Sequence, residues 1–195
     1  MGNRRLGRKR LYALEKRGES LTASDLGMGV GASPMLVHAH RSREGSEIVT
    51  EIVLNLAPSG TDITAGDSQA DGVIGVDGSK SEIASWTRAR FGYITGFEMV
   101  FIEAVDNSTA AFKSNLSLKQ STSSLNGGAD AGSDVVFDIA AGTLGIVEGV
   151  AISLGQAFDT TKPNIYLTAD SGAAATKYTG GKIVLRITGI DDPTA

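Results

Sequence analysis

Hydrophobic side chains alternate with polar ones through much of the chain after residue 35. In the segment 47–56 one face of an extended chain would carry Ile48, Thr50, Ile52, Leu54 and Leu56, and the other Glu47, Val49, Glu51, Val53 and Asn55. A period of two is typical of a half-buried β-strand, and Pro58 ends it because proline cannot donate a ladder hydrogen bond. The segment 182–188 repeats the pattern, with Ile183, Leu185 and Ile187 opposite Val184, Arg186 and Thr188. Both segments are predicted strands.

The longest apolar stretch of the chain is 91–105, FGYITGFEMVFIEAV. It is apolar on both faces, with Tyr93 and Thr95 on the same face as Phe97, which predicts a central strand with a bulge or bend near Gly96. The segment 112–119 alternates, with Phe112, Leu116 and Leu118 inward and Lys113, Asn115 and Lys119 outward. Shorter runs predict further strands within 73–76, 135–139, 144–154 and 164–169.

The spacing of these segments, with no long helix between them, is typical of a β-sandwich. Abundant glycine (25 residues) and few aromatic residues agree with a β protein that has many turns. We therefore predict an all-β fold, an antiparallel β-sandwich that is jelly-roll-like with about eight strands, over residues 35–195. Residues 1–34 are predicted to form an extended basic N-terminal arm and a linker. Because no strand precedes the GxGxG string at 27–31 and no helix follows it, we interpret residues 19–34 as a flexible connector and not as a phosphate-binding loop.

Charge separates the first seventeen residues from the rest of the chain. This arm has seven basic residues and one acidic residue, a net charge of +6, whereas the whole chain has 18 basic and 22 acidic residues. The remainder therefore has 11 basic and 21 acidic residues, or −10. The segment 8–17 could form a short helix that ends at Gly18, but it needs a surface to be stable. The candidate docking residues are Arg4, Arg5, Leu6, Arg8, Lys9, Arg10, Leu11, Tyr12, Leu14, Lys16 and Arg17.

The rest of the sequence has no catalytic signature. There is no cysteine and no GxSxG motif, so a thiolate site and a hydrolase elbow are both excluded. His38 and His40 would share a strand face and could chelate a metal ion, but no third ligand stands at a recognisable spacing, so we interpret them as solvated. The loop aspartates lack calcium-loop spacing: Asp62, Asp67, Asp71, Asp77, Asp130 and Asp134. We predict a protein that is not an enzyme and has no metal or cofactor.

Three kinds of partner could bind the arm. Nucleic acid is disfavoured because Tyr12 is the only aromatic residue available for stacking and the acidic body would repel a duplex. A membrane is disfavoured because the arm has only three leucines and one tyrosine as anchors, and no apolar run approaches the ~18 residues of a transmembrane helix. A protein surface, which can offer both acidic and apolar contacts, is the favoured partner.

The segment MGNRRLGRKRLYALEK, together with a Gly/Ala/Thr-rich body that closes with GGKIVLRITG, resembles a family of small structural proteins of tailed marine phages. The resemblance implies a location in the virion and a capsid decoration (cement) protein as the simplest function. Its implied partners are the major capsid protein and other copies of itself, as a dimer or trimer.

Two alternatives to this function remain open. One is a tail, collar or fibre-associated protein, in which an exposed Trp86 with Tyr93 or Tyr178 could engage a fibre or a glycan, although a core position for Trp86 is the simpler interpretation. The other is an internal virion protein that binds nucleic acid.

Overall fold

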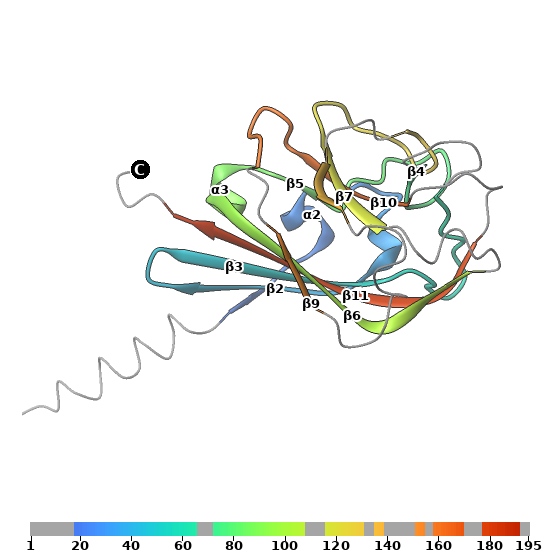
Figure 1. Cartoon of the computed structure of the whole chain (residues 1–195), viewed down its shortest axis with the longest axis horizontal. Coiled ribbons are helices and arrows are strands. Elements are labelled where there is room, and N and C mark those ends of the chain that lie inside the picture. The colour runs from blue at the N-terminus through green and yellow to red at the C-terminus, as the bar shows by residue number, and fades with distance from the viewer. Residues whose placement is uncertain are drawn as a thin grey trace, which may run out of the picture.

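The computed structural model describes residues 18–65, 72–107, 116–130, 135–138, 151–154, 158–169 and 177–191. These residues form two antiparallel β-sheets that lie in two layers (Figure 1). The predicted all-β fold with antiparallel sheets is confirmed, whereas the jelly-roll connectivity stays a prediction.

The larger sheet has six strands. Their spatial order is β1 (Glu19–Ser20), β2 (Leu36–Glu44), β3 (Glu47–Asn55), β11 (Tyr178–Ile190), β6 (Tyr93–Asn107) and β9 (Ala151–Leu154). The last described strand, β11, is therefore inserted between β3 and β6 and pairs with both along most of its length.

The second sheet is smaller. Its order is β4 (Gly72–Val73), β10 (Asn164–Ala169), β7 (Leu116–Ser121) and β8 (Val135–Asp138), and β5 (Ala84–Ser85) also pairs with β10. Of the eleven strands that the structure describes, β1, β4 and β5 have two residues each, which leaves eight longer strands. Two α-helices and one 3-10 helix are described: α2 (Ala23–Leu26), α3 (Arg88–Phe91) and η1 (Ser33–Met35).

The core lies between the two sheets. Ile52 and Leu185 from the larger sheet belong to the same buried cluster as Leu118 and Leu167 from the smaller one. The alternation predicted for β3 and β11 is confirmed, because the residues assigned to the inner face are buried: Ile48, Thr50, Ile52, Leu54, Leu56, Ile183, Leu185 and Ile187. Burying this apolar surface is the main stabilising contribution to the fold.

A bulge near Gly96 is confirmed, and it reverses two side chains. Thr188 on β11 pairs with Gly96, and Gly189, the next residue of β11, pairs with Ile94. Thr95 therefore has no partner on β11 and is the extra residue of the bulge. Ile94 consequently packs on the core, and Tyr93 is exposed. The period-two pattern predicts Tyr93 on the same face as Phe97, and this prediction is wrong because the bulge shifts the register by one residue.

Residues 19–34 are not a flexible connector, which corrects the sequence analysis. Leu21, Leu26 and Ala32 are buried in the common core, and α2 is stabilised by a capping box between Thr22 and Asp25. The GxGxG string has a structural explanation as well. The amide of Gly29 donates to the main-chain oxygen of Glu82, and a Cβ at this position would overlap the neighbouring backbone. Glycine is needed there for close approach of two segments.

The strand β7 also departs from the prediction. Lys119, expected on an outer face, is buried, as are the four other residues of 116–120, because β7 lies between β10 and β8 and is covered on both faces. Residues 112–115, 139 and 144–150, which the sequence assigns to strands, lie outside the described residues. The basic arm, residues 1–17, also lies outside them.

Candidate functional site

The chain enters the body at one edge of the six-stranded sheet. In β1, Glu19 pairs with Arg41 and Ser20 pairs with His40 of β2. The next residue, Leu21, donates its amide to the main-chain oxygen of Ala39 at 2.9 Å and buries its side chain. We call residues 18–21 the arm junction, because they connect the basic arm to the folded body.

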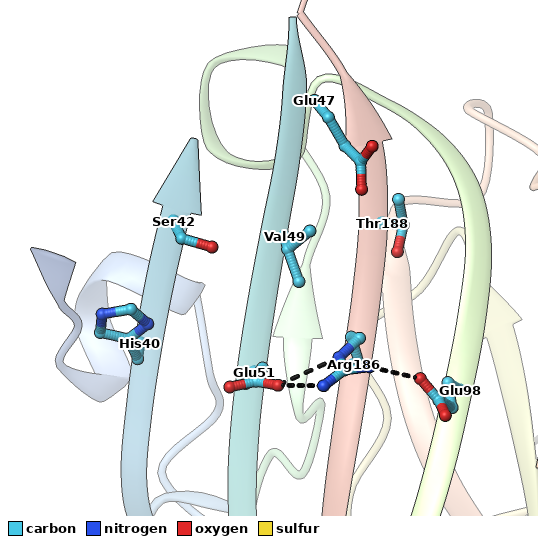
Figure 2. A pocket seen from close by; sticks show the side chains of 8 residues that line it. All are labelled: His40, Ser42, Glu47, Val49, Glu51, Glu98, Arg186 and Thr188. Atoms are coloured by element: carbon cyan, nitrogen blue, oxygen red, sulfur yellow. Dashed lines mark hydrogen bonds and ion pairs between the residues drawn. The ribbon is translucent and has the colours of Figure 1, made fainter. Parts of the chain in front are cut away.

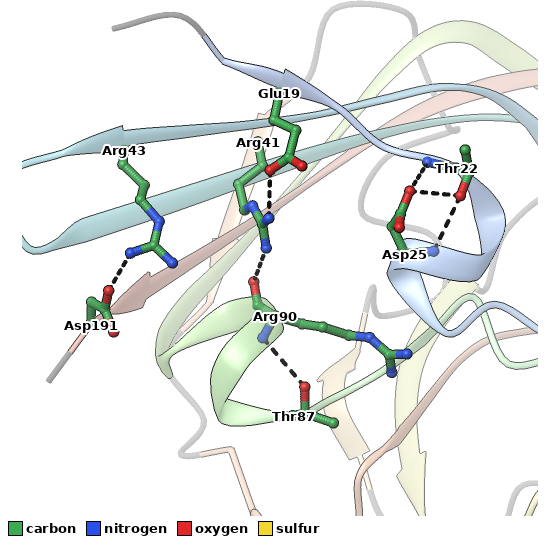
Figure 3. Close-up of polar contacts among 8 residues, drawn as sticks. All are labelled: Glu19, Thr22, Asp25, Arg41, Arg43, Thr87, Arg90 and Asp191. Carbon is green, nitrogen blue, oxygen red and sulfur yellow. Dashed lines mark hydrogen bonds and ion pairs between the residues drawn. The ribbon is translucent and has the colours of Figure 1, made fainter. Parts of the chain in front are cut away.

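Arg41 fastens the arm junction to a second element. Its Nη2 lies 2.6 Å from Oε2 of Glu19, and its Nη1 donates to the main-chain oxygen of Arg90 at 3.0 Å (Figure 3). The Arg41 side chain is only 19% exposed, so these contacts are partly shielded from water. The carbonyl that accepts from Arg41 belongs to α3, whose N-terminus is capped by Thr87.

The helix α2 continues directly from the arm junction. Thr22 Oγ1 donates to Asp25 Oδ2 at 2.6 Å, and the Thr22 amide donates to the same oxygen at 2.8 Å (Figure 3). These hydrogen bonds from Thr22 lower the pKa of Asp25. Leu21 is buried and Ala23 begins the helix, so the first described residues have little freedom to separate from the body.

A row of polar and charged side chains crosses the outer face of the six-stranded sheet, the face that points away from the second sheet. We call it the charged row. Its members are successive strand partners: Ser20, His40, Glu51, Arg186 and Glu98. The row therefore begins in the arm junction and crosses the sheet as far as β6.

Arg186 is the centre of the charged row. Its Nε and Nη2 donate to Glu51 Oε1 at 3.0 and 2.6 Å, and its Nη1 donates to Glu98 Oε2 at 2.8 Å (Figure 2). The hydrogen bonds to Glu51 are the main cause that raises the pKa of Arg186. One guanidinium thus joins three neighbouring strands, β3, β11 and β6.

Apolar side chains lie beside the charged row on the same face. The apolar row consists of successive partners Val53, Val184 and Val100, which are half-buried. At one end of the sheet Tyr93 faces Ile190, and these two side chains are 46% and 45% exposed. The guanidinium carbon of Arg88 lies 4.8 Å from the centre of the Tyr93 ring. The outer face is therefore not a purely polar, solvated surface.

A shallow depression of about 440 Å³ lies on this face. It is lined by His40, Ser42, Glu47, Val49, Glu51, Glu98, Arg186 and Thr188 (Figure 2). The lining has three carboxylates and one guanidinium, so it is net acidic. Its rim at His40 adjoins the arm junction, because the imidazole ring lies so close to Gly18 that a Cβ there would overlap it.

The eleven arm residues predicted as a docking site all lie in 1–17, outside the described residues. The outer face of the six-stranded sheet was not among the sites predicted from the sequence. A signal for it exists, because Val49, Val53 and Val184 occupy positions that the alternation assigns to the outer face. Valines there are unusual for a fully solvated sheet face.

The two histidines do share the outer face, with ring centroids 6.4 Å apart. Within the part of the chain that the structure describes, no three His, Asp or Glu side chains form a group that could hold a metal ion. Of the predicted loop aspartates, Asp62 forms a 2.6 Å ion pair with Lys177. Asp67, Asp71 and Asp134 lie outside the described residues.

Trp86, Tyr93 and Tyr178 do not form a common exposed platform. Trp86 is half-buried, donates Nε1–H to the main-chain oxygen of Gly92 at 2.9 Å and packs against the Phe158 ring. Tyr178 is buried in the core. Only Tyr93 of the three is exposed, and its partner is Arg88.

No described helix is both long enough and apolar enough to cross a membrane. Comparisons with protein-family models, curated proteins and solved structures find no match for this chain. The resemblance to phage structural proteins therefore stays a prediction.

Proposed function

We propose that this chain is a non-enzymatic structural protein of a phage virion, and that it decorates the capsid. In this proposal the basic arm, residues 1–17, docks on the shell of major capsid protein and ties neighbouring subunits together. The β-sandwich body lies over the shell and contacts other copies of the chain in a dimer or trimer.

The observation that carries the proposal is the attachment of the arm to the body. An arm that ties subunits together is useful only if its base resists being pulled away. Here the base is held by strand pairing with β2, by the buried Leu21 side chain, and by Arg41, which contacts both Glu19 and the Arg90 carbonyl. Tension on the arm would be transmitted directly into the six-stranded sheet and into α3.

The charge distribution supports a protein partner. The arm carries +6 and the rest of the chain −10. A nucleic-acid partner would be repelled by the body, whereas an acidic and partly apolar protein surface could accept both the cations and the leucines of the arm.

The test uses capsids assembled without this protein. Full-length chain and a variant that lacks residues 1–17 are incubated with the shells, which are then pelleted, and occupancy is quantified on gels. We expect the truncated variant to lose most of its binding. Full occupancy by the truncated variant would contradict the proposal.

Two further measurements distinguish the alternatives. A salt titration of binding to duplex DNA tests the internal nucleic-acid-binding protein, for which the affinity should fall steeply with salt. A map of the intact particle tests the tail, collar or fibre location, because it places the body directly.

A matched control for the shell-binding experiment is Arg43→Ala, which removes one cation from the body and leaves the arm intact.

A further inference from the structure

The outer face of the six-stranded sheet has carboxylate groups with unused hydrogen-bonding capacity. Arg186 contacts one oxygen of Glu51 and one of Glu98, and the second oxygen of each has no partner among the described residues. Glu47, which lines the same depression, pairs through its backbone with Glu44 and Ile190, but its carboxylate has neither an ion pair nor a hydrogen bond with any described residue. Beside these groups lies the half-buried apolar row of Val53, Val184 and Val100. Such a surface would bind a segment that has both cations and apolar side chains.

We propose that this outer face is a docking surface for the chain's own basic arm, and that the arm lies across it when the protein is not attached to a partner. The proposal concerns the free protein and does not depend on its location in a virion. A shell surface, or any other partner of the arm, would then have to compete with the sheet.

The position at which the described chain begins supports an intramolecular contact. Gly18 lies against the His40 ring, at the rim of the depression. From His40 to Glu98 there are three strand spacings, or about 14 Å at roughly 4.8 Å each. An extended chain covers about 3.3 Å per residue, so about five residues cross the row. The seventeen residues of the arm are more than sufficient.

The arm and the outer face also match in charge and in hydrophobicity. The arm has seven cations, and the depression has three carboxylates against one guanidinium. The three leucines of the arm, Leu6, Leu11 and Leu14, could cover the apolar row next to the charged one. Because the arm is covalently attached, its effective concentration at the face is of the order of millimolar. Individually weak contacts are then enough to keep it docked.

The experiment places one spin label on the arm. The chain has no cysteine, so Gly7→Cys creates a unique labelling site at a position outside the proposed docking residues. Paramagnetic broadening of backbone amides is then measured in dilute protein at about 0.05 M salt. We expect the amides of Glu51, Val184 and Arg186 to broaden at least severalfold more than those of Leu118 and Leu167 in the second sheet. The difference should largely disappear at about 1 M salt, where the Debye length is about 3 Å.

A matched pair of variants tests the acidic side of the contact. Glu47→Gln removes one carboxylate from the depression, and Asp77→Asn removes one from an exposed turn that does not line it. We expect the first to lower the ratio of docked to free arm about two- to fivefold and the second to leave it unchanged, since one exposed ion pair contributes about that much. Dispersed amide spectra show that both variants are folded.

Three outcomes would overturn the proposal. Broadening that is equal in both sheets, or absent, at low salt means that the arm does not dock on the outer face. Broadening that arises only when labelled and isotope-enriched molecules are mixed means that arms exchange between copies. Equal effects of Glu47→Gln and Asp77→Asn on the ratio of docked to free arm mean that the arm does not bind specifically to the depression. None of these outcomes changes the expectation for shell binding, so the two proposals fail independently.

Discussion

Arg41 donates a hydrogen bond at 3.0 Å to the main-chain oxygen of Arg90, which lies 49 positions further along the chain. The same guanidinium is paired with Glu19. Arg41→Ala should therefore lower the free energy of unfolding by about 1–2 kcal/mol, because it leaves a partly buried carbonyl without its charged donor. Urea denaturation measures the loss, and hydrogen exchange of the Leu21 amide should become faster, since the arm junction is held less firmly.

Arg43→Ala is the control for that prediction. Arg43 is two residues away on the same strand and pairs with Asp191, but both side chains are well exposed (47% and 39%). Exposed pairs contribute about 0–1 kcal/mol, so the loss should be smaller and the Leu21 amide should be unaffected. Equal effects of the two substitutions would show that Arg41 has no special role at the arm junction.

Two buried tyrosines should respond in opposite ways to removal of the hydroxyl group. Tyr178 Oη is buried and has no hydrogen-bond partner among the described residues. Tyr166 Oη donates to the Ser123 carbonyl and accepts from the Leu125 amide, both at 2.8 Å. Tyr178→Phe should leave the free energy of unfolding unchanged or raise it by up to about 1 kcal/mol. Tyr166→Phe should lower it by about 1–3 kcal/mol, because two loop groups lose their partner.

Chemical denaturation of the two variants under identical conditions checks the tyrosine prediction. The comparison is direct, since each variant loses one oxygen atom from a fully buried ring. A large destabilisation by Tyr178→Phe would mean that its hydroxyl group has a favourable interaction that the described contacts do not contain.

Two glycines on the neighbouring interior strands β11 and β6 should differ in their tolerance of a methyl group. A Cβ on Gly189 would overlap the main-chain oxygen of Phe91, whereas a Cβ on Gly96 would meet no atom within 4 Å. Gly189→Ala should therefore destabilise the fold by about 1–3 kcal/mol or more, because backbone must move. Gly96→Ala should be neutral or slightly stabilising, since alanine restricts the unfolded chain. Thermal unfolding of both variants, at equal concentration, tests this contrast.

Stability should fall at alkaline pH. Burial raises the pKa of Tyr166 to about 12 and also raises that of Tyr178, whereas an unfolded tyrosine titrates near pH 10. The folded state therefore retains protons that the unfolded state releases. The contribution of these two tyrosines to the free energy of unfolding is fully present below about pH 10 and is lost as the pH rises from 10 toward 12.

Urea midpoints measured between pH 9 and pH 11.5 test the alkaline prediction. Tyr178→Phe should show a shallower decline, because one of the two groups is absent. Absorbance at the tyrosinate band gives a second readout, in which these two rings titrate later in the folded protein than in urea. If the urea midpoint falls equally with pH in the wild type and in Tyr178→Phe, the raised pKa of Tyr178 is contradicted.

Period-two alternation was enough to predict the strands that form the centre of the fold. In β3, and in β11 from Gly181 onward, each inner-face residue is followed by an outer-face residue, so the faces could be read directly from the sequence. In β6 the bulge at Thr95 interrupts the register, and the predicted face of Tyr93 was wrong for that reason. In β7 the alternation failed at Lys119, because a strand covered on both faces buries polar residues as well.

The candidate site was less accessible to sequence reasoning. The basic arm is evident from composition, but its base at residues 18–21 looked like linker because glycines and serines surround it. Tertiary contacts hold these residues in place: Leu21 packs in the core, and Arg41 reaches Glu19 from a position 22 residues further along the chain. The charged row is also invisible in the sequence, since its central members Glu51, Glu98 and Arg186 come from three strands that are far apart along the chain.

The insertion of β11 between β3 and β6 also determines when the fold can be completed. Glu51 and Arg186 are 135 positions apart, and Glu98 and Arg186 are 88 apart. Closing loops of this length costs entropy before any contact is gained, which slows folding. During synthesis β3 and β6 have emerged from the ribosome long before their shared neighbour, and each has an unpaired edge in that interval. The six-stranded sheet is therefore completed only after β11 has been translated.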